Sequence, residues 1–229
     1  MTNEPQNIAR VVRQHAEMDA FFAGDFAVRG DIPAQSESSA EEPAHCQVPA
    51  SVQEGLAAIA AEVRACCRCG LDKSRTNPVP GEGNPAADLV FVGEAPGADE
   101  DAAGRPFVGR AGQLLNNIIA AMGMARQDVF ICNILKCRPP DNRDPRPDEI
   151  IHCLPFLQRQ LELIRPKVIV ALGAHAARTL LKTELPIGRL RGRFHEYYFS
   201  PDAPPVKLMP TYHPAYLLRN YSPDNRRRV

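Results

Sequence analysis

The stretch GEAPGADED, residues 93–101, combines a tight, glycine-containing turn with four carboxylates. It follows the apolar run DLVFVG and therefore reads as a turn at the end of a buried strand, a common phosphate-binding place. Carboxylates, however, repel a phosphate. Such a turn suits a neutral ligand better, because a carboxylate held there can position water or stabilise developing positive charge. In a second interpretation, Glu94 caps the next segment and the other acids form a solvated loop.

Three further side chains have types and positions suited to binding a planar, uncharged ligand. Phe107 follows a proline in GRPFVG, where an exposed ring would be a stacking platform; a core phenylalanine is the alternative. Asn133 ends an apolar strand, where asparagine is disfavoured. Its amide can both donate and accept a hydrogen bond, as recognition of a ligand edge requires. The alternative is that it caps a turn. His213 precedes Pro214, which restricts its backbone to extended conformations. For His175, at the start of an apolar helix, we predict capping or packing.

The segment AYLLR closely follows His213 and carries two leucines and an arginine just beyond the last expected strand. Leucines exposed at the edge of a binding site can insert between the stacked bases of DNA. The alternative is that Leu217 and Leu218 pack as ordinary helix residues.

Four of the seven cysteines have a spacing that suggests a metal site. The motif CCRC provides Cys66 and Cys69, and Cys137 and Cys153 follow farther along the chain. One close pair with two separated thiols suits an iron–sulfur cluster better than a structural zinc ion, which more often uses two close pairs. Zinc and unrelated free thiols are the alternatives. Disulfides are disfavoured, because nothing in the sequence marks a secreted protein.

Four short apolar runs alternate with helical patterns, so the sequence predicts an α/β fold. Helices are expected at 52–65, 111–123, 148–164 and 174–182, and strands at 88–93, 128–133, 167–173 and 206–211. Helical crossovers between such strands make a three-layer α/β/α sandwich around a central four-stranded, mostly parallel sheet. Ligands bind beyond the carboxyl ends of the strands in such sheets. The sequence places Glu94, Asn133 and His213 there.

The chain divides into two parts of opposite charge. Residues 1–50 hold eight acidic and three basic side chains, a formal charge of −5, whereas residues 51–229 carry +5. The first part is rich in Pro, Ser and Glu and is expected to be a partly disordered arm and linker. The second is expected to be one globular domain, basic enough to contact phosphates. No apolar run could span a membrane and the polar N-terminus is no signal peptide, so we expect a cytoplasmic protein.

Six motifs in order make the chain resemble a family 4 uracil-DNA glycosylase, the iron–sulfur branch of the uracil-DNA glycosylase superfamily. They are CCRC, GEGNP (81–85), GEAPGADED, GRPFVGRAGQLL (104–115), NILKCRPPDNR (133–143) and HPAYLLRN (213–220). The resemblance implies a DNA-repair hydrolase that flips uracil out of DNA and hydrolyses its N-glycosidic bond, leaving an abasic site for base excision repair. The implied partner is uracil-containing DNA, single- or double-stranded. We expect a monomer whose acidic arm is either disordered or docks an unknown protein.

The resemblance also implies a role for each matching residue. A 4Fe-4S cluster would be bound by Cys66, Cys69, Cys137 and Cys153. The catalytic residues would be Glu94, Glu100 and His213, with His213 facing uracil O2 and one of the carboxylates activating water; Asp101 is a third candidate for that task. The base would contact Gly93, Ala95, Phe107, Asn133 and Asn142, with Phe107 stacking on uracil and Asn133 reading its edge. Leu217, Leu218 and Arg219 would lie in a DNA-inserting loop.

Three other classes of protein fit the sequence less well. A related branch traps uracil covalently through a histidine in a basic loop; residues 138–147 contain no histidine, and that branch favours glutamine where this chain has Ala95. A non-catalytic nucleic-acid-binding iron–sulfur protein would have no need to retain the acidic turn together with Asn133 and His213. A nucleotide-binding Rossmann-like protein would need a full G-x-G-x-x-G fingerprint, which the sequence lacks.

Overall fold

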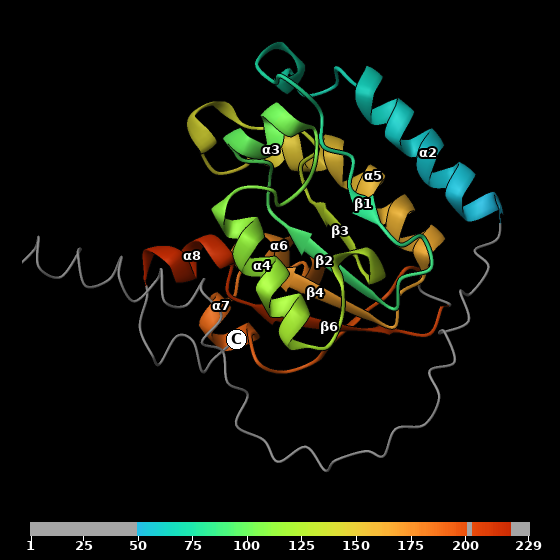
Figure 1. Cartoon of the computed structure of the whole chain (residues 1–229), viewed down its shortest axis with the longest axis vertical. Helices are drawn as coiled ribbons and strands as arrows, with labels where there is room; N and C mark the ends of the chain where they lie inside the picture. The colour runs from blue at the N-terminus through green and yellow to red at the C-terminus, as the bar shows by residue number, and fades with distance from the viewer. Residues whose placement is uncertain (1–49, 201–202, 221–229) are drawn as a thin grey trace, which may run out of the picture. The chain divides into compact units, whose positions relative to one another are not determined.

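The computed structural model describes residues 50–200 and 203–220, and within them six strands form one sheet (Figure 1). The strand order is β1-β3-β2-β4-β6-β5. The central strands run parallel to one another and are β3 (Phe130–Asn133), β2 (Leu89–Gly93), β4 (Val168–Leu172) and β6 (Val206–Thr211). The edge strands β1 (Glu82–Gly83) and β5 (His195–Tyr197) are antiparallel to their neighbours.

The predicted α/β fold is confirmed, with six strands in the described residues rather than four. Each predicted strand lies within two residues of an observed parallel strand at both ends. The two additional strands contain only two and three residues. Neither carries an apolar run, because an edge strand packs against only one neighbour and can stay partly exposed. The sequence pattern therefore could not reveal them.

Helices cover both faces of the sheet, which makes the predicted three layers. They are α2 (Ala50–Ala65), α3 (Ala98–Ala103), α4 (Arg110–Ala121), α5 (Pro147–Ile164), α6 (Ala174–Leu181), α7 (Ile187–Leu190) and α8 (Pro214–Arg219), with short 3-10 turns η1 (Leu71–Lys73), η2 (Arg126–Asp128) and η3 (Pro140–Asn142). Alternate residues of a strand point to opposite faces. Accordingly, Val90 and Val92 of β2 share a core cluster with α5 and α6, whereas Phe91 packs with Leu115 and Ile119 of α4.

Helix α2 lies along α5 on the outside of the sandwich (Figure 1). Ile59 and Val63 of α2 are fully buried against Phe156 of α5. Because α2 ends at residue 65, this packing delivers the CCRC motif that follows to the side of α5.

The acidic stretch expected to be a turn instead forms a short helix, α3, after residue 97. At its start the Gly97 N–H donates to Glu100 Oε2 at 3.1 Å, so the Glu100 side chain reaches back to the residue that precedes the helix. Glycine is among the favoured N-cap residues, and a glutamate three residues later is part of the usual helix-start pattern. The predicted N-terminal arm and linker, residues 1–50, lie outside the described residues, apart from residue 50. Among the helices of residues 50–200 and 203–220, none is long and apolar enough to cross a membrane.

Candidate active site

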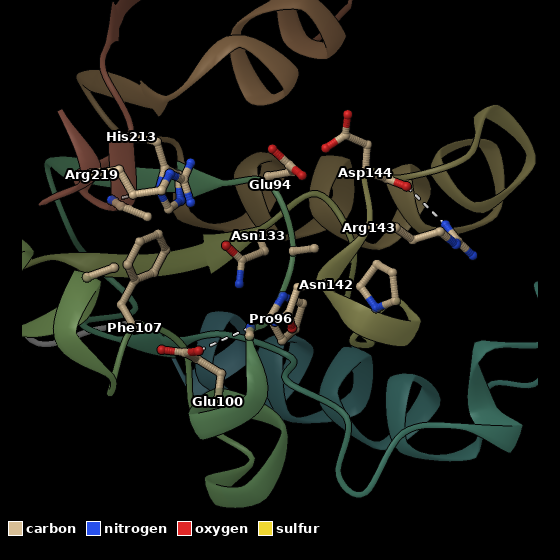
Figure 2. Close-up of a pocket in the computed structure, with 15 residues that line it drawn as sticks. Glu94, Pro96, Glu100, Phe107, Asn133, Asn142, Arg143, Asp144, His213 and Arg219 are labelled. Carbon is tan, nitrogen blue, oxygen red and sulfur yellow. Dashed lines mark hydrogen bonds between the residues drawn. The ribbon is translucent and has the colours of Figure 1, made fainter. Parts of the chain in front are cut away.

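A cavity of about 360 Å³ opens at the carboxyl ends of the parallel strands (Figure 2). This volume is within the range that holds a small organic ligand. The lining residues come from the strand ends, from α3 and the start of α4, from the loop before α5 and from α8: Glu94, Ala95, Pro96, Gly97, Glu100, Phe107, Ala111, Asn133, Pro139, Asn142, Arg143, Asp144, His213, Ala215 and Arg219. The fold therefore brings together most of the residues that the sequence indicated. Gly93, Leu217 and Leu218 are outside this lining.

Asn133 lies at the inner end of the cavity, where β3 ends beside β2. Its side chain is only 1 % exposed, yet Oδ1 has no hydrogen-bond partner among the described residues. A buried acceptor left unpaired costs about 1–3 kcal/mol. A ligand N–H would remove that cost, so the amide is prepared for a planar group that offers a donor.

Phe107 forms the neighbouring wall and is held by its main chain. Its φ of 51° is in the left-handed region, and its carbonyl accepts a hydrogen bond from Arg126 Nη1 at 3.2 Å. Gly112 of α4 permits this backbone path, because a Cβ there would stand 1.9 Å from the Phe107 oxygen. The Phe107 ring lies 5.6 Å from the His213 ring, centroid to centroid. The Phe107 ring is thus buried in the core and also lines the cavity, so it has a feature of each interpretation, the core phenylalanine and the ring that faces a ligand.

Both carboxylate oxygens of Glu100 accept hydrogen bonds from main-chain amides. Oε1 accepts from Val108 N–H at 2.9 Å and Gly109 N–H at 3.0 Å, and Oε2 accepts from Gly97 N–H. It therefore ties the start of α3 to the loop before α4. These hydrogen bonds hold the cavity wall beside Phe107 in shape. Because both oxygens of Glu100 already accept from main-chain amides, Glu94 is better placed than Glu100 to act on a ligand.

His213 is the residue before α8, and its ring caps that helix. Nδ1 accepts a hydrogen bond from Ala215 N–H at 3.1 Å, so in the neutral ring the proton is on Nε2. Burial lowers the pKa of His213 to about 4; the Arg219 charge adds to this, and Glu100 opposes it. Near neutral pH, His213 is therefore an uncharged donor at the cavity.

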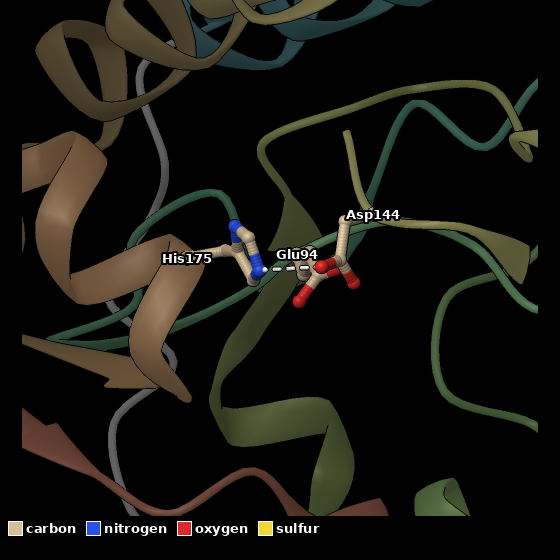
Figure 3. A group of neighbouring side chains, drawn as sticks. All are labelled: Glu94, Asp144 and His175. Atoms are coloured by element: carbon tan, nitrogen blue, oxygen red, sulfur yellow. Dashed lines mark ion pairs between the residues drawn. The ribbon is translucent and has the colours of Figure 1, made fainter. Parts of the chain in front are cut away.

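Glu94 follows β2 and belongs to a cluster with Asp144 and His175 (Figure 3). One ligand atom from each of the three lies within 4.8 Å of the others, and His175 Nε2 is 3.6 Å from Asp144 Oδ2. Burial, followed by the charge of Asp144, raises the pKa of Glu94, while His175 and Arg219 act in the opposite direction. The sequence predicted only capping or packing for His175. His175 follows β4 by one helical turn and therefore lies at the carboxyl edge of the sheet, so its position in the sequence could have indicated that it lies near Glu94.

The loop before α5 supplies Asn142, and its shape is held by charged hydrogen bonds. Asn142 has a φ of 53°, and its Oδ1 accepts from Arg138 Nε at 2.8 Å. The next residue, Arg143, pairs with the buried Glu149, whose Oε2 also accepts from Arg146 N–H at 2.8 Å. These bonds fix the part of the loop that borders the cavity. Asp144, which the sequence did not single out, is placed there by them.

Helix α8 presents its side chains differently from the predicted inserting loop. Leu217 is buried and packs into the body, so it is not available to enter DNA in this conformation; Leu218 is half-buried. Tyr216 is exposed instead and stacks on Tyr212 with ring centroids 4.9 Å apart. Arg219 is exposed and lines the cavity. The short helix turns one leucine inward, which a run of adjacent apolar residues cannot indicate.

The four cysteines predicted to bind a metal lie close enough to affect one another. Burial, with smaller contributions from the thiols of Cys137 and Cys69, raises the pKa of Cys153 to about 12. Cys66 and Cys69 likewise raise the pKa of Cys137, after burial. Within the described part of the chain, no three cysteine sulfurs lie within 4.8 Å of one another. A zinc ion with Zn–S bonds of about 2.3 Å holds its sulfurs about 3.8 Å apart. Among the described residues, no three of these sulfurs therefore have the spacing of a single zinc site.

The family model described as the uracil DNA glycosylase superfamily matches residues 80–229. The chain belongs to this superfamily.

Within the superfamily, the chain is similar to type-4 uracil-DNA glycosylases. It is 49 % identical to that of Saccharolobus solfataricus over 172 residues, covering 73 % of this chain and 79 % of the relative. It is 49 % identical to that of Archaeoglobus fulgidus over 177 residues, covering 76 % and 87 %. For Thermotoga maritima the identity is 46 % over 178 residues, covering 77 % and 90 %.

Proposed function

We propose that this protein is a DNA-repair glycosylase that flips uracil out of DNA, hydrolyses its N-glycosidic bond and releases free uracil. The observation that carries the proposal is the buried Asn133 amide, whose Oδ1 lacks a partner at the inner end of a cavity walled by Phe107. The names of the type-4 relatives support the same activity. An extruded base has a planar face to stack and an edge to hydrogen-bond, as this cavity requires.

Uracil recognition follows from the hydrogen-bonding groups of Asn133. Oδ1 accepts from uracil N3–H and Nδ2 donates to O4, while Phe107 stacks on the ring. Cytosine presents the reverse pattern, an acceptor at N3 and a donor at N4. A site built on such a matched pair rejects the mismatched analogue by about 10⁴–10⁵.

Bond cleavage leaves negative charge on uracil and positive charge on the sugar. The neutral His213 donates from Nε2 to uracil O2 and stabilises the negative charge by hydrogen bonding. Glu94, with Asp144 beside it, stabilises the positive charge and orients the attacking water; Asn142 assists from the loop before α5. Glu100 keeps Phe107 and the α3 start in place. Arg219 and Leu218 contact the DNA next to the flipped nucleotide.

We further propose that Cys66, Cys69, Cys137 and Cys153 hold a 4Fe-4S cluster. Their thiols lie close enough to affect one another, and four thiolates are the ligands that such a cluster takes. When bound, the cluster would tie the end of α2 to the loop after β3 and to α5. A monomeric state, a cytoplasmic location and a protein partner for residues 1–50 stay predictions.

The activity is tested with anaerobically purified protein and a labelled oligonucleotide that contains one uracil, treated with hot alkali to break abasic sites. Cleavage at uracil with release of the free base is expected, and none at thymine in a matched oligonucleotide. Glu94→Gln should lose most of the activity. Binding without release, or a protein–DNA adduct on a denaturing gel, would contradict the proposal and favour a covalent or non-catalytic binder.

A further inference from the structure

Lys136 is a completely buried lysine that the proposed reaction does not use. It lies in the loop after β3, three residues beyond Asn133 and next to Cys137, and is 1 % exposed. Its Nζ donates to the main-chain oxygen of Asn133 at 3.0 Å and to Gln160 Oε1 at 2.7 Å. Gln160 is itself buried in α5 and donates to Pro80 O at 2.8 Å. The lysine therefore joins β3, α5 and the segment before β1.

The two hydrogen-bond acceptors of Lys136 are neutral, so they provide no charge to balance its ammonium. None of the ion pairs found in residues 50–200 and 203–220 includes this lysine. A buried ammonium without a nearby anion is strongly disfavoured. Lys136 directly precedes Cys137, one of the proposed cluster ligands. Cysteines bind a cluster as thiolates, so a bound cluster would bring negative charge next to this ammonium.

The same residue contacts both functional regions through different atoms. Its main chain lies next to the Cys153 thiol, whereas its side chain donates to the carbonyl of Asn133. Asn133 is the residue whose amide would read the base. Displacement of the Lys136 side chain would therefore move the base-reading residue as well as change the charge beside the cysteines.

We propose that Lys136 is a positioning residue that balances the charge of the cysteine-bound cluster and holds Asn133 for uracil recognition, so that the two sites are coupled. The inference rests on the proposed function and on the proposed cofactor. Groups outside the ligand shell tune a metal centre through charge and hydrogen bonds to its sulfurs. Here one such group also reaches the substrate cavity.

The experiment compares Lys136→Met with Arg75→Met in the anaerobically purified full-length protein. Arg75 is the matched control, because its Nη1 donates to Cys137 Sγ at 3.0 Å, while its guanidinium also donates to the main-chain oxygens of Val63 and Arg64 near the end of α2. Iron content, the reduction potential by EPR-monitored titration, and kcat and KM on a uracil oligonucleotide are measured. Both variants should lower the potential, because each removes a positive charge beside the sulfurs. Only Lys136→Met should also raise KM, by about 10-fold or more.

Lys136→Gln separates the two roles and serves if Lys136→Met does not fold. It keeps a donor for Asn133 O but lacks the charge, so we expect a lowered potential with KM closer to that of the natural protein. Equal KM values in all variants would overturn the coupling. An unchanged potential in the Lys136 variants would overturn the charge role.

The underlying function and cofactor are checked by separate readouts. Natural protein that releases uracil but contains no iron would refute the cofactor and this proposal with it. Protein that contains the cluster but releases no uracil would refute the glycosylase and with it the coupling, whatever the measured potentials.

Discussion

Gly93 and Asn133 lie opposite each other at the carboxyl ends of β2 and β3, so close that a Cβ on residue 93 would stand 2.3 Å from Asn133 Oδ1. The same Cβ would lie 2.6 Å from Cζ of Phe107. The missing side chain on β2 therefore permits the close spacing of the Phe107 ring and the Asn133 amide.

Gly93→Ala should lower kcat/KM for uracil release by about 10² without unfolding the protein, because displacement of a substrate-positioning group by about 1 Å costs that much. Gly188→Ala is the control, since a Cβ at that glycine of α7 would meet nothing within 4 Å. Steady-state kinetics and circular dichroism of both variants provide the measurement. Activity of Gly93→Ala equal to that of the control would show that Asn133 and Phe107 yield without consequence.

Asn133→Asp should reduce the preference for uracil over cytosine, because an ionised carboxylate only accepts and loses the donor that matches uracil O4. A decrease of about 10⁴ is expected if the amide provides most of the discrimination. The measurement is single-turnover release of each base from otherwise identical oligonucleotides. An unchanged ratio would refute the assigned role.

His213 should titrate near pH 4 rather than near its ordinary value of 6.5. Because the folded-state pKa is lower than the unfolded one, this group stabilises the fold above about pH 6.5, and that contribution is lost as the pH falls toward 4. Nitrogen-15 NMR of the histidine ring should show a neutral Nε2–H form at pH 6. A midpoint near 6.5 would contradict the neutral-donor assignment.

Glu94→Gln should abolish most activity and yet stabilise the protein. Burial and Asp144 raise the pKa of Glu94, so the ionised carboxylate that the reaction requires costs more free energy in the fold than in the unfolded chain. Removal of that charge should increase stability by about 0.5–2 kcal/mol, a gain typical of changes that relieve a functional site. Thermal unfolding at pH 7.5 and pH 4 gives the measurement, and the gain should shrink at the lower pH, where Glu94 is protonated. A lower melting temperature at pH 7.5 would count against this account.

Asp144→Asn should move the acidic limb of the pH–activity profile to lower pH. The Asp144 charge raises the pKa of Glu94, so its removal lets Glu94 ionise at lower pH. Asp141→Asn, in the same loop, is the control, because Asp141 is not among the groups that shift Glu94. A profile that moves equally in both variants would point to a general effect of the loop charge.

Local patterns predicted the central part of the fold. The four parallel strands are apolar runs bounded by turn residues, and burial on both faces by helices requires such runs. Their observed limits lie within two residues of the prediction. The edge strands β1 and β5 did not appear in the pattern, because they bury too little to need one. Helix α3 also escaped notice, although the Gly97-x-x-Glu100 spacing that caps it is visible in the sequence.

The sequence alone determined the residue types of the proposed sites: an acidic turn after a strand, an asparagine at a strand end, a histidine before a proline and four spaced thiols. Their roles depended on tertiary structure, because hydrogen bonds and burial join residues far apart in the chain. Glu100 is occupied by the amides of Gly97, Val108 and Gly109, Leu217 faces inward, and His175 meets Glu94 across two adjacent strands. The contact from Lys136 to Asn133 likewise exists only once the loop after β3 folds back against α5.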